Sequence, residues 1–200
     1  MPTLPGAGAG APAVDTDKMV RIMDAKIAAT ENERHRRNLE TVREHMNRER
    51  LLDPAGVMGT LSPEANYKLW VDGVDLGAKG LPAIREWYVD TNIRRNRTFV
   101  IEYDLERVVV DDDVVVTEGQ MNVVVDAAYV SEVLGLDCDA DDIMLHSFRQ
   151  IVFWPVDADS KLLGEEFYTN GYGNQKALRK LAPDEIPVDW HALVKLSREI

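Results

Sequence analysis

Cysteine is almost absent from this sequence, because Cys138 is the only one among 200 residues. A single thiol cannot form an intrachain disulfide, and it cannot supply the set of thiolates that a structural zinc site needs. A chain without disulfides is typical of a reducing compartment, and we expect a cytoplasmic protein. No stretch approaches the roughly 18 consecutive apolar residues of a membrane-spanning helix, so no membrane partner is expected.

Positive charge is also scarce: 23 Lys and Arg residues stand against 35 Asp and Glu residues, for a formal net charge of −12. An acidic surface repels phosphate backbones and anionic lipids, which argues against a nucleic-acid partner. Residues 1–14 carry no charge and lack the basic start and apolar centre of a signal peptide. We expect residues 1–16 to form a flexible tail.

Helical periodicity dominates the first third of the chain. One apolar stripe begins near Asp17, and a second stripe with the same period follows the polar stretch 30–38. That polar stretch is either the solvated middle of one long helix or a break between two helices. Asp53 followed by Pro54 predicts a short helix to about Leu61, because an N-cap oxygen before proline is a helix-start signal.

The pattern then changes to that of strands. A first strand is expected over 67–71 and a further helix over 80–93. Residues 99–106 alternate between apolar and acidic side chains, which predicts a strand with one solvated face. The sequence VVVDDDVVV over 108–116 predicts a hairpin.

The second half of the chain continues the sheet. The returning strand is expected to reach Val125 and to be followed by a long loop over 126–142. Two further strands are expected over 143–156 and 161–170, and a last helix over 190–199.

This order of elements predicts an α+β fold, in which helices cover one face of an antiparallel sheet. No internal repeat or domain boundary is apparent. We therefore expect a single domain over residues 17–182, with residues 183–200 as a C-terminal extension.

Three sequence phrases resemble the nuclear-transport-factor-2-like (SnoaL-like) superfamily over roughly residues 36–182. NLETVREHMNRERLLDPAGVMGTLSPEANYKLW resembles its first two helices and first strand, GLPAIREWY its third helix, and VFWPVDADSKLLGEEFYTN its closing hairpin. The resemblance implies a cone-shaped half-barrel, in which a curved, mostly antiparallel sheet wraps around N-terminal helices. It also implies an enclosed apolar ligand pocket.

The catalytic carboxylates that the resemblance leads us to look for are missing from the matching positions of this sequence. The positions that hold an Arg and an Asp in limonene-epoxide hydrolases are Gly119 and Met121 here, and the isomerase acid position holds Val152. The strand HSFRQIVFW, where cyclases place a general-base Asp, has no carboxylate. The closing strand ends in Tyr168-Thr169-Asn170 where relatives often have Tyr-Trp-Asp.

His146 is the candidate catalytic residue. Counting from the last turn, it shares the pocket-facing side of its strand with Gln150 and Trp154. A histidine in an apolar pocket suits general acid/base chemistry near neutral pH. The alternative is that His146 is a hydrogen-bonded residue of the core or of a dimer interface.

Aromatic and amide side chains are the candidate ligand-binding groups, because they combine shape with a polar tip. Each could equally be simple core, and Gln120 shares its strand face with Glu118 and Asn122, so it lines either the cavity or the outer surface. The candidates are Tyr67, Trp87, Tyr88, Gln120, Gln150, Trp154, Tyr168 and Asn170.

No metal site and no cofactor are expected. The acidic run 137–141 lacks the glycine and the bidentate Glu of a calcium loop. His35 and His45 lie ten residues apart and His191 lies far away, so none has the spacing of a metal pair.

The sequence therefore favours a cofactor-independent enzyme that acts on a small, apolar, cyclic molecule of the polyketide, steroid or terpenoid kind. Its chemistry would be acid/base proton transfer, as in an isomerase, dehydratase, cyclase or hydrolase. The alternative is a non-catalytic small-molecule-binding or protein-interaction module that uses the same pocket. A homodimer is expected, because relatives commonly pair through the outer face of the sheet.

Overall fold

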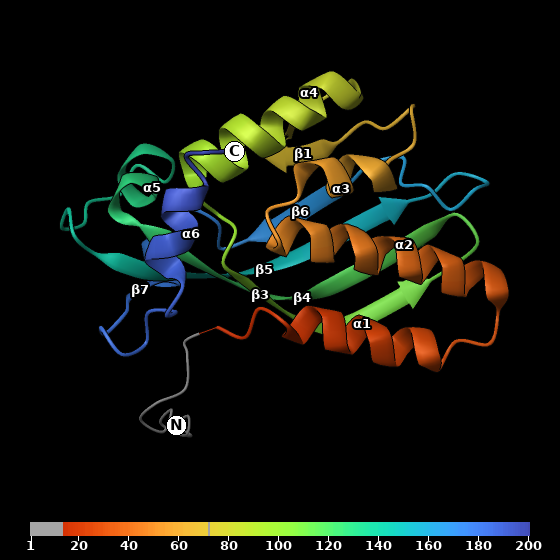
Figure 1. Cartoon of the computed structure of the whole chain (residues 1–200), viewed down its shortest axis with the longest axis horizontal. Helices are drawn as coiled ribbons and strands as arrows, with labels where there is room; N and C mark the ends of the chain where they lie inside the picture. Colours follow the sequence, from red (N-terminus) through yellow and green to blue (C-terminus); the bar gives the residue numbers. More distant parts are fainter. Residues whose placement is uncertain (1–13, 72) are drawn as a thin grey trace.

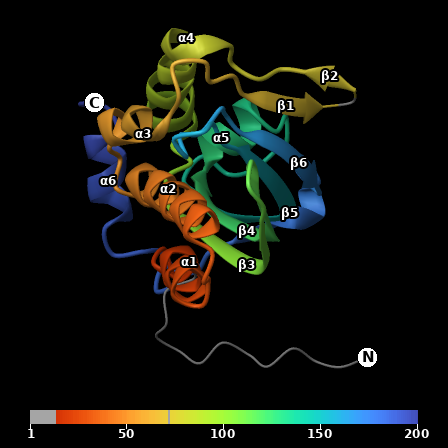
Figure 2. The same cartoon turned by 90° about the vertical axis from the view of Figure 1, so that its right-hand side faces the viewer.

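A strongly curved sheet with helices in its concave face organises the chain (Figure 1). The computed structural model describes residues 14–71 and 73–200. Viewed from the side, strands β3 to β6 form a curved sheet, and α2 lies on its concave side (Figure 2). The expected α+β half-barrel is therefore confirmed.

The sheet has the order β2-β1-β6-β5-β4-β3, with β7 added to one end of β5. Its four long and medium strands β3 to β6 form the expected antiparallel meander, whereas β1 pairs with β6 in parallel. The strands are β1 (Lys68–Val71), β2 (Val74–Asp75), β3 (Ile101–Val110), β4 (Val114–Asp126), β5 (Ile143–Pro155), β6 (Glu166–Asn170) and β7 (Leu178–Lys180).

The helices cover the concave face and the two ends of the sheet. They are α1 (Lys18–Ala28), α2 (Glu33–Arg50), α3 (Pro54–Thr60), α4 (Gly80–Glu86), the π-helix η1 (Trp87–Asn96), α5 (Ala127–Glu132), the 3₁₀ turn η2 (Gln175–Ala177) and α6 (Trp190–Leu196). Asp53 caps α3 as expected, because its side chain accepts from the backbone N–H of Gly56.

The polar stretch after α1 is a break between two helices. Asn32 lies in extended backbone conformation, and its side chain accepts a hydrogen bond from the backbone N–H of His35. This N-cap starts α2 and sends it in a new direction from α1, so the alternative of one long helix is wrong.

Three expected elements differ from the structure. The loop expected over 126–142 contains α5, which Asp126 caps by accepting from the backbone N–H of Tyr129. The helix expected over 80–93 is α-helical only to Glu86 and continues as a π-helix. The last strand begins at Glu166 rather than at Lys161, because Leu162 instead makes isolated bridges with Leu61 and Val156.

Two apolar cores hold the layers together. The inner face of α2 places Leu39, Val42 and Met46 in the main core between the helices and the sheet. A second core forms where Trp190 of the C-terminal segment packs with Phe99. The segment over 183–200 is therefore packed against the end of the sheet.

The start of the chain is described only from Val14. Most of the tail expected over 1–16 lies outside the described residues. Val14 is buried in the second core, and the backbone N–H of Asp15 donates to Glu102 of β3 at 2.7 Å. Among the described residues, no helix is both long and apolar enough to cross a membrane.

Asn38 fastens α2 to two hairpin turns. Its amide nitrogen donates to the carbonyls of Asp111 and Asp112 at 3.0 and 3.1 Å, and its amide oxygen accepts from Ser160 at 2.8 Å. The side chain is fully buried. One amide therefore satisfies polar groups of the β3–β4 turn and of the turn after β5.

We predict that Asn38→Ala lowers the free energy of unfolding by about 2–3 kcal/mol, because it leaves several buried polar groups without partners. Urea denaturation monitored by circular dichroism measures the change. Arg37→Ala is the matched control, since Arg37 is half exposed on the same helix turn and makes only an ion pair with Glu33. Its effect should stay within about 0.5 kcal/mol. Equal losses in the two variants would contradict the assigned role of Asn38.

Candidate functional site

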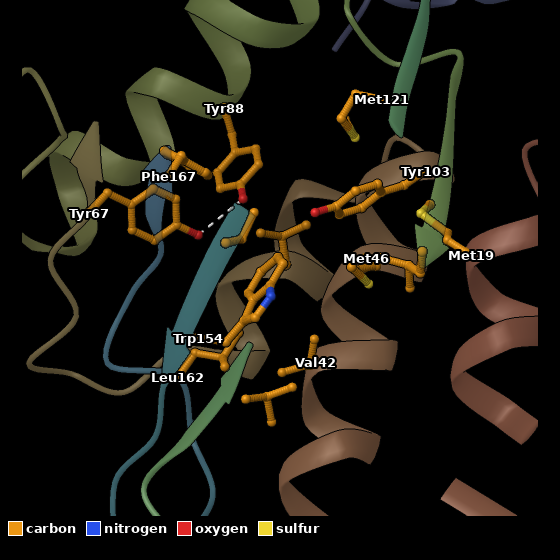
Figure 3. Close-up of a cluster of buried hydrophobic side chains, with 14 of the residues drawn as sticks. Met19, Val42, Met46, Tyr67, Tyr88, Tyr103, Met121, Trp154, Leu162 and Phe167 are labelled. Carbon is orange, nitrogen blue, oxygen red and sulfur yellow. Dashed lines mark hydrogen bonds between the residues drawn. The ribbon is translucent and has the colours of Figure 1, made fainter. Parts of the chain in front are cut away.

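An apolar pocket of about 220 Å³ lies between the concave face of the sheet, α2 and η1. Figure 3 shows several of its wall residues, including Met46, Tyr103 and Trp154, around the inner end. Two carboxylates, Glu49 and Glu165, interrupt this apolar lining. Glu165 is buried and Glu49 is partly buried, and acidic groups in an apolar wall are rare enough to mark a functional site.

A larger hollow of about 480 Å³ lies on the outside, between α2, α3 and the turn after β5. Its basic side chains already have partners, as Arg48 has in Glu44 and Lys161 has in the Gly59 carbonyl. It holds no buried ionisable group of perturbed pKa, so the inner pocket is the better candidate.

His45 is the central residue of a polar cluster at the inner end of the pocket. The other members of this cluster are Glu49, Thr60, Tyr67, Tyr88 and Glu165. It follows Val42 by three residues on the inward face of α2, and it is fully buried. Its Nδ1 lies 2.6 Å from the Thr60 hydroxyl, whose own proton is donated to the Val57 carbonyl at 2.7 Å. Because Thr60 has only one proton to give, His45 Nδ1 must be the donor to Thr60.

The other ring nitrogen of His45 faces the acids. Nε2 lies 3.0 Å from Glu165 and 2.9 Å from the Tyr88 hydroxyl. Tyr88 in turn lies 2.8 Å from Glu165 and 2.6 Å from Glu49. A phenol has one proton, so Tyr88 can donate to only one of these acceptors at a time. The other carboxylate needs a second donor, and Nε2 of His45 is within hydrogen-bond distance of Glu165 but lies 4.0 Å from Glu49.

Burial and mutual repulsion set the protonation of this cluster. Burial, reinforced by the negative charge of Glu165, raises the pKa of Glu49 to about 7. Burial opposes the charged form of His45, but its hydrogen bond to Glu165 and the charges of both acids outweigh that effect and raise its pKa above the usual value. Burial and the same acids raise the pKa of Tyr67 and Tyr88 far above neutrality. Both phenols are thus protonated, and Glu49 is the group whose charge changes near pH 7.

Glu49 is also the member that a ligand can reach. Its side chain lines the pocket and keeps 29% of its surface accessible, whereas His45 is sealed behind it. The arrangement therefore presents an acid of near-neutral pKa to an apolar pocket, with a histidine positioning the second acid.

The same cluster has the donor set of a metal site. Ligand atoms of His45, Glu49 and Glu165 lie within 4.8 Å of one another. The hydroxyl of Tyr88, however, lies within 2.6 to 2.9 Å of all three groups and occupies the centre between them. This geometry fits proton sharing and not metal coordination. The other such group, His35 with Asp111 and Asp112, lies at the surface.

Several expected ligand-binding residues do meet in the pocket. Trp87, Gln150 and Trp154 line it. Tyr67 and Tyr88 stand behind the wall as members of the polar cluster, with their hydroxyls 3.0 Å apart (Figure 3).

The expected positions of Tyr168 and Asn170 in the pocket need correction. Phe167 and Thr169 of β6 line the pocket, so the alternation of the strand turns Tyr168 and Asn170 outward. Tyr168 is 41% exposed, and its hydroxyl donates to Glu166. Gln120 is likewise on the face of β4 opposite Met121, which lines the pocket.

His146 lies on the concave side of β5, as its parity predicts, but it does not line the pocket. Its ring packs against Tyr129, Phe148 and Tyr172, which do line the pocket and cover it. Burial lowers the pKa of His146 to about 4, so the ring is neutral at pH 7. Its proposed catalytic role therefore requires the covering side chains to move.

Sequence reasoning missed the acidic cluster. A signal existed for His45, because it falls within the apolar stripe of Leu39, Val42 and Met46, where an ionisable residue is unexpected. Glu165 gave none. It points inward because Gly164, at φ +139°, turns the chain against the Asn66 carbonyl, only 1.9 Å from where a β-carbon would lie.

We predict that Glu49→Gln changes the pH dependence of stability. The folded-state pKa of Glu49 lies above its unfolded value of 4.5, so its contribution to stability is full below about pH 4.5 and is lost as the pH rises through about 7. Between pH 5 and pH 8 the wild type should therefore lose about 2–3 kcal/mol relative to Glu49→Gln.

Urea denaturation at the two pH values gives this difference directly. Glu40→Gln, at an exposed position of the same helix, should follow the wild-type profile. Parallel profiles for the wild type and Glu49→Gln would show that the pKa of Glu49 is not raised.

Comparisons with known proteins bear on the fold. No protein-family model matches the sequence, and no curated protein matches it. The structure is similar to a protein described as a SnoaL-like polyketide cyclase from Shewanella putrefaciens CN-32, with a TM-score of 0.59, 9% identity, and coverage of 77% of this chain and 91% of that one.

Two further structures are similar. One, described as a SnoaL-like polyketide cyclase from Jannaschia sp. CCS1, has a TM-score of 0.56 and 14% identity, with coverage of 74% of this chain and 95% of that one. The other is TerC, co-crystallised with polyporic acid, with a TM-score of 0.50 and 14% identity over 70% of this chain and 97% of that one. The chain therefore shares the fold of nuclear-transport-factor-2-like (SnoaL-like) proteins.

Proposed function

We propose that the protein is a cofactor-independent enzyme that transfers a proton to or from carbon in a small, apolar, ring-containing molecule. The observation that carries the proposal is the pair of carboxylates in the apolar pocket, one of which has a pKa of about 7. A carboxyl group poised near neutrality both accepts and returns a proton efficiently. The likeness to polyketide cyclases and to a protein that binds polyporic acid supports a cyclic ligand.

Each residue then has a role that follows from its contacts. Glu49 in its charged form takes the proton from a carbon beside a carbonyl group. Glu165 lies 3.0 Å from Nε2 of His45, and its negative charge helps to keep the pKa of Glu49 high. Gln150 and Asn92 present amide groups to the same pocket, and their N–H groups would stabilise the negative charge that develops on the carbonyl oxygen. Isomerisation, dehydration and cyclisation all share this step.

Proton exchange on a simple ketone tests this role without knowledge of the natural substrate. We predict that the wild type speeds deuterium incorporation at the α-carbons of 2-tetralone in D₂O, followed by NMR. The rate should rise with pH through about 7, because Glu49 must lose its proton to act as a base. Glu49→Gln should lower the catalysed rate by about 10²-fold or more.

Glu40→Gln is again the matched control, and it should exchange at the wild-type rate. Exchange that persists in both Glu49→Gln and Glu165→Gln would refute catalysis by this cluster. His146→Gln separates the two catalytic proposals, because it should keep exchange if Glu49 is the base and lose it if His146 is.

The second candidate is a binding module that uses the same pocket. It is favoured by the absence of a carboxylate at Val152 and along the rest of β5. Binding of 2-tetralone with no exchange above the buffer rate would select it.

We also propose a two-fold homodimer formed through the outer face of the sheet. Apolar side chains are exposed there on neighbouring strands, since Val109 and Phe153 flank Val116 of β4, and Ile151 pairs with Tyr168. A contiguous exposed apolar face is typical of an interface. A stable dimer would bury about 1,200–2,000 Å².

Light scattering at micromolar concentration should give twice the chain mass of 22.5 kDa. Phe153→Asp should shift the protein to monomer, while Lys161→Asp, at an exposed position near the last turn, should leave the mass unchanged. A monomer mass for the wild type would rule out this assembly.

A further inference from the structure

His146 has an unusual environment, which differs from that of the polar cluster around His45. Its two ring nitrogens are the only buried side-chain nitrogen or oxygen atoms without a hydrogen-bond partner in the described part of the chain. Leaving buried polar atoms unpaired lowers the stability of the fold, and most proteins avoid it. The chain satisfies its other buried polar side chains, so this exception calls for a function.

The cover over His146 is held by few contacts. The ring centroid of Tyr172 lies 5.4 Å from that of His146 and 5.2 Å from that of Phe148. The Tyr172 side chain makes one hydrogen bond, with the Tyr129 hydroxyl at 2.8 Å. Tyr172 is 47% exposed although it lines the pocket. It can therefore leave its place without unpacking the core.

The backbone around Tyr172 is suited to such a movement. Gly171 and Gly173 flank it, and both have positive φ values, of 95° and 78°. Beyond the end of β6, a β-carbon at Gly173 would meet nothing within 4 Å. Glycine-flanked turns with few packing contacts open at low cost in free energy.

We propose that His146 is a second ligand-binding group of the pocket, exposed when Tyr172 swings away, and that it binds a hydroxyl group of the ligand. A neutral imidazole offers one donor and one acceptor, which a phenol or alcohol complements. When Tyr172 moves, its phenol ring no longer packs against the imidazole ring of His146. The hydroxyl group of the ligand would then occupy the space beside the imidazole.

The inference rests on the proposed function and narrows its substrate class. Glu49 and Glu165 outnumber Arg50, the basic side chain that the pocket lining also contains and that pairs with Asp17 at 3.0 Å. The pocket therefore disfavours an anionic ligand, because like charges repel in an apolar environment. The ligand is then a neutral, hydroxylated ring compound, with a carbonyl group near the two acids and a hydroxyl group at His146.

Two fluorescent probes that differ by one hydroxyl group test the proposal. We expect the wild type to bind 2-naphthol about tenfold more tightly than naphthalene, as one well-formed hydrogen bond would give. His146→Phe keeps an aromatic ring without polar atoms, so it should reduce this preference to about twofold or less while naphthalene affinity is retained. The variant should fold, because it removes two unpaired nitrogens.

Chemical labelling tests the movement of Tyr172 in a chain that retains His146. Diethylpyrocarbonate should modify His146 slowly in the wild type and at least about tenfold faster in Tyr172→Ala, with 2-naphthol restoring protection. Mass spectrometry gives each rate relative to the exposed His191. Equal labelling rates in the two proteins would overturn the proposed cover.

The outcomes separate this inference from the proposed function. A hydroxyl preference that persists in His146→Phe but disappears in Glu165→Gln would assign the hydroxyl group to the acids and overturn the inference, whatever the exchange assay shows. A preference lost in His146→Phe supports the inference even if 2-tetralone undergoes no catalysed exchange.

Discussion

The hydrogen bonding of His45 is the constraint on which the site depends. One nitrogen is tied to Thr60 at the end of α3, and the other meets Tyr88 of η1 and Glu165 beside β6. A single side chain of α2 thus connects three separate elements. Burying an imidazole and two carboxylates is favourable only while each satisfies the others. The shape of the inner pocket and the charge state of the cluster are therefore set together.

This coupling explains why the acids do not occupy the positions that the family resemblance suggests. The strand β5 carries Val152 and Trp154 toward the pocket, and both are apolar. The acids come instead from the helix layer and from the segment ahead of β6. A pocket in this fold is enclosed by helix and sheet alike, so carboxylates from either layer can reach the same space.

Sequence periodicity predicted the parts of the fold that are locally determined. Alternation identified the long strands, and the cap at Asp53 located α3, because both signals are contained within a few neighbouring residues. The outward orientation of Tyr168 was not predictable in this way, since alternation separates two faces without saying which one packs on the helices. The six-residue helix α5 escaped notice because it is too short to show a period.

The candidate site was harder to predict for the same reason. His45 and Glu165 lie 120 residues apart in sequence and meet only through packing. No local pattern distinguishes Glu165 from Glu166, the glutamate that follows it, whereas His45 stands within an apolar stripe. The half of the site on α2 was thus visible in the sequence, and the half beside β6 required the structure.

The parallel pairing of β1 with β6 has a consequence for the order in which the molecule forms. Lys68 pairs with Glu166, 98 residues later in the chain, and such distant contacts form slowly because a long loop must close first. During synthesis on the ribosome, α2 emerges long before the segment that carries Glu165. His45 and Glu49 can form their contacts with Glu165 only after that segment has been synthesised. The polar cluster is therefore completed among the final steps of folding, and the nascent chain exposes the apolar surface of the half-barrel until then.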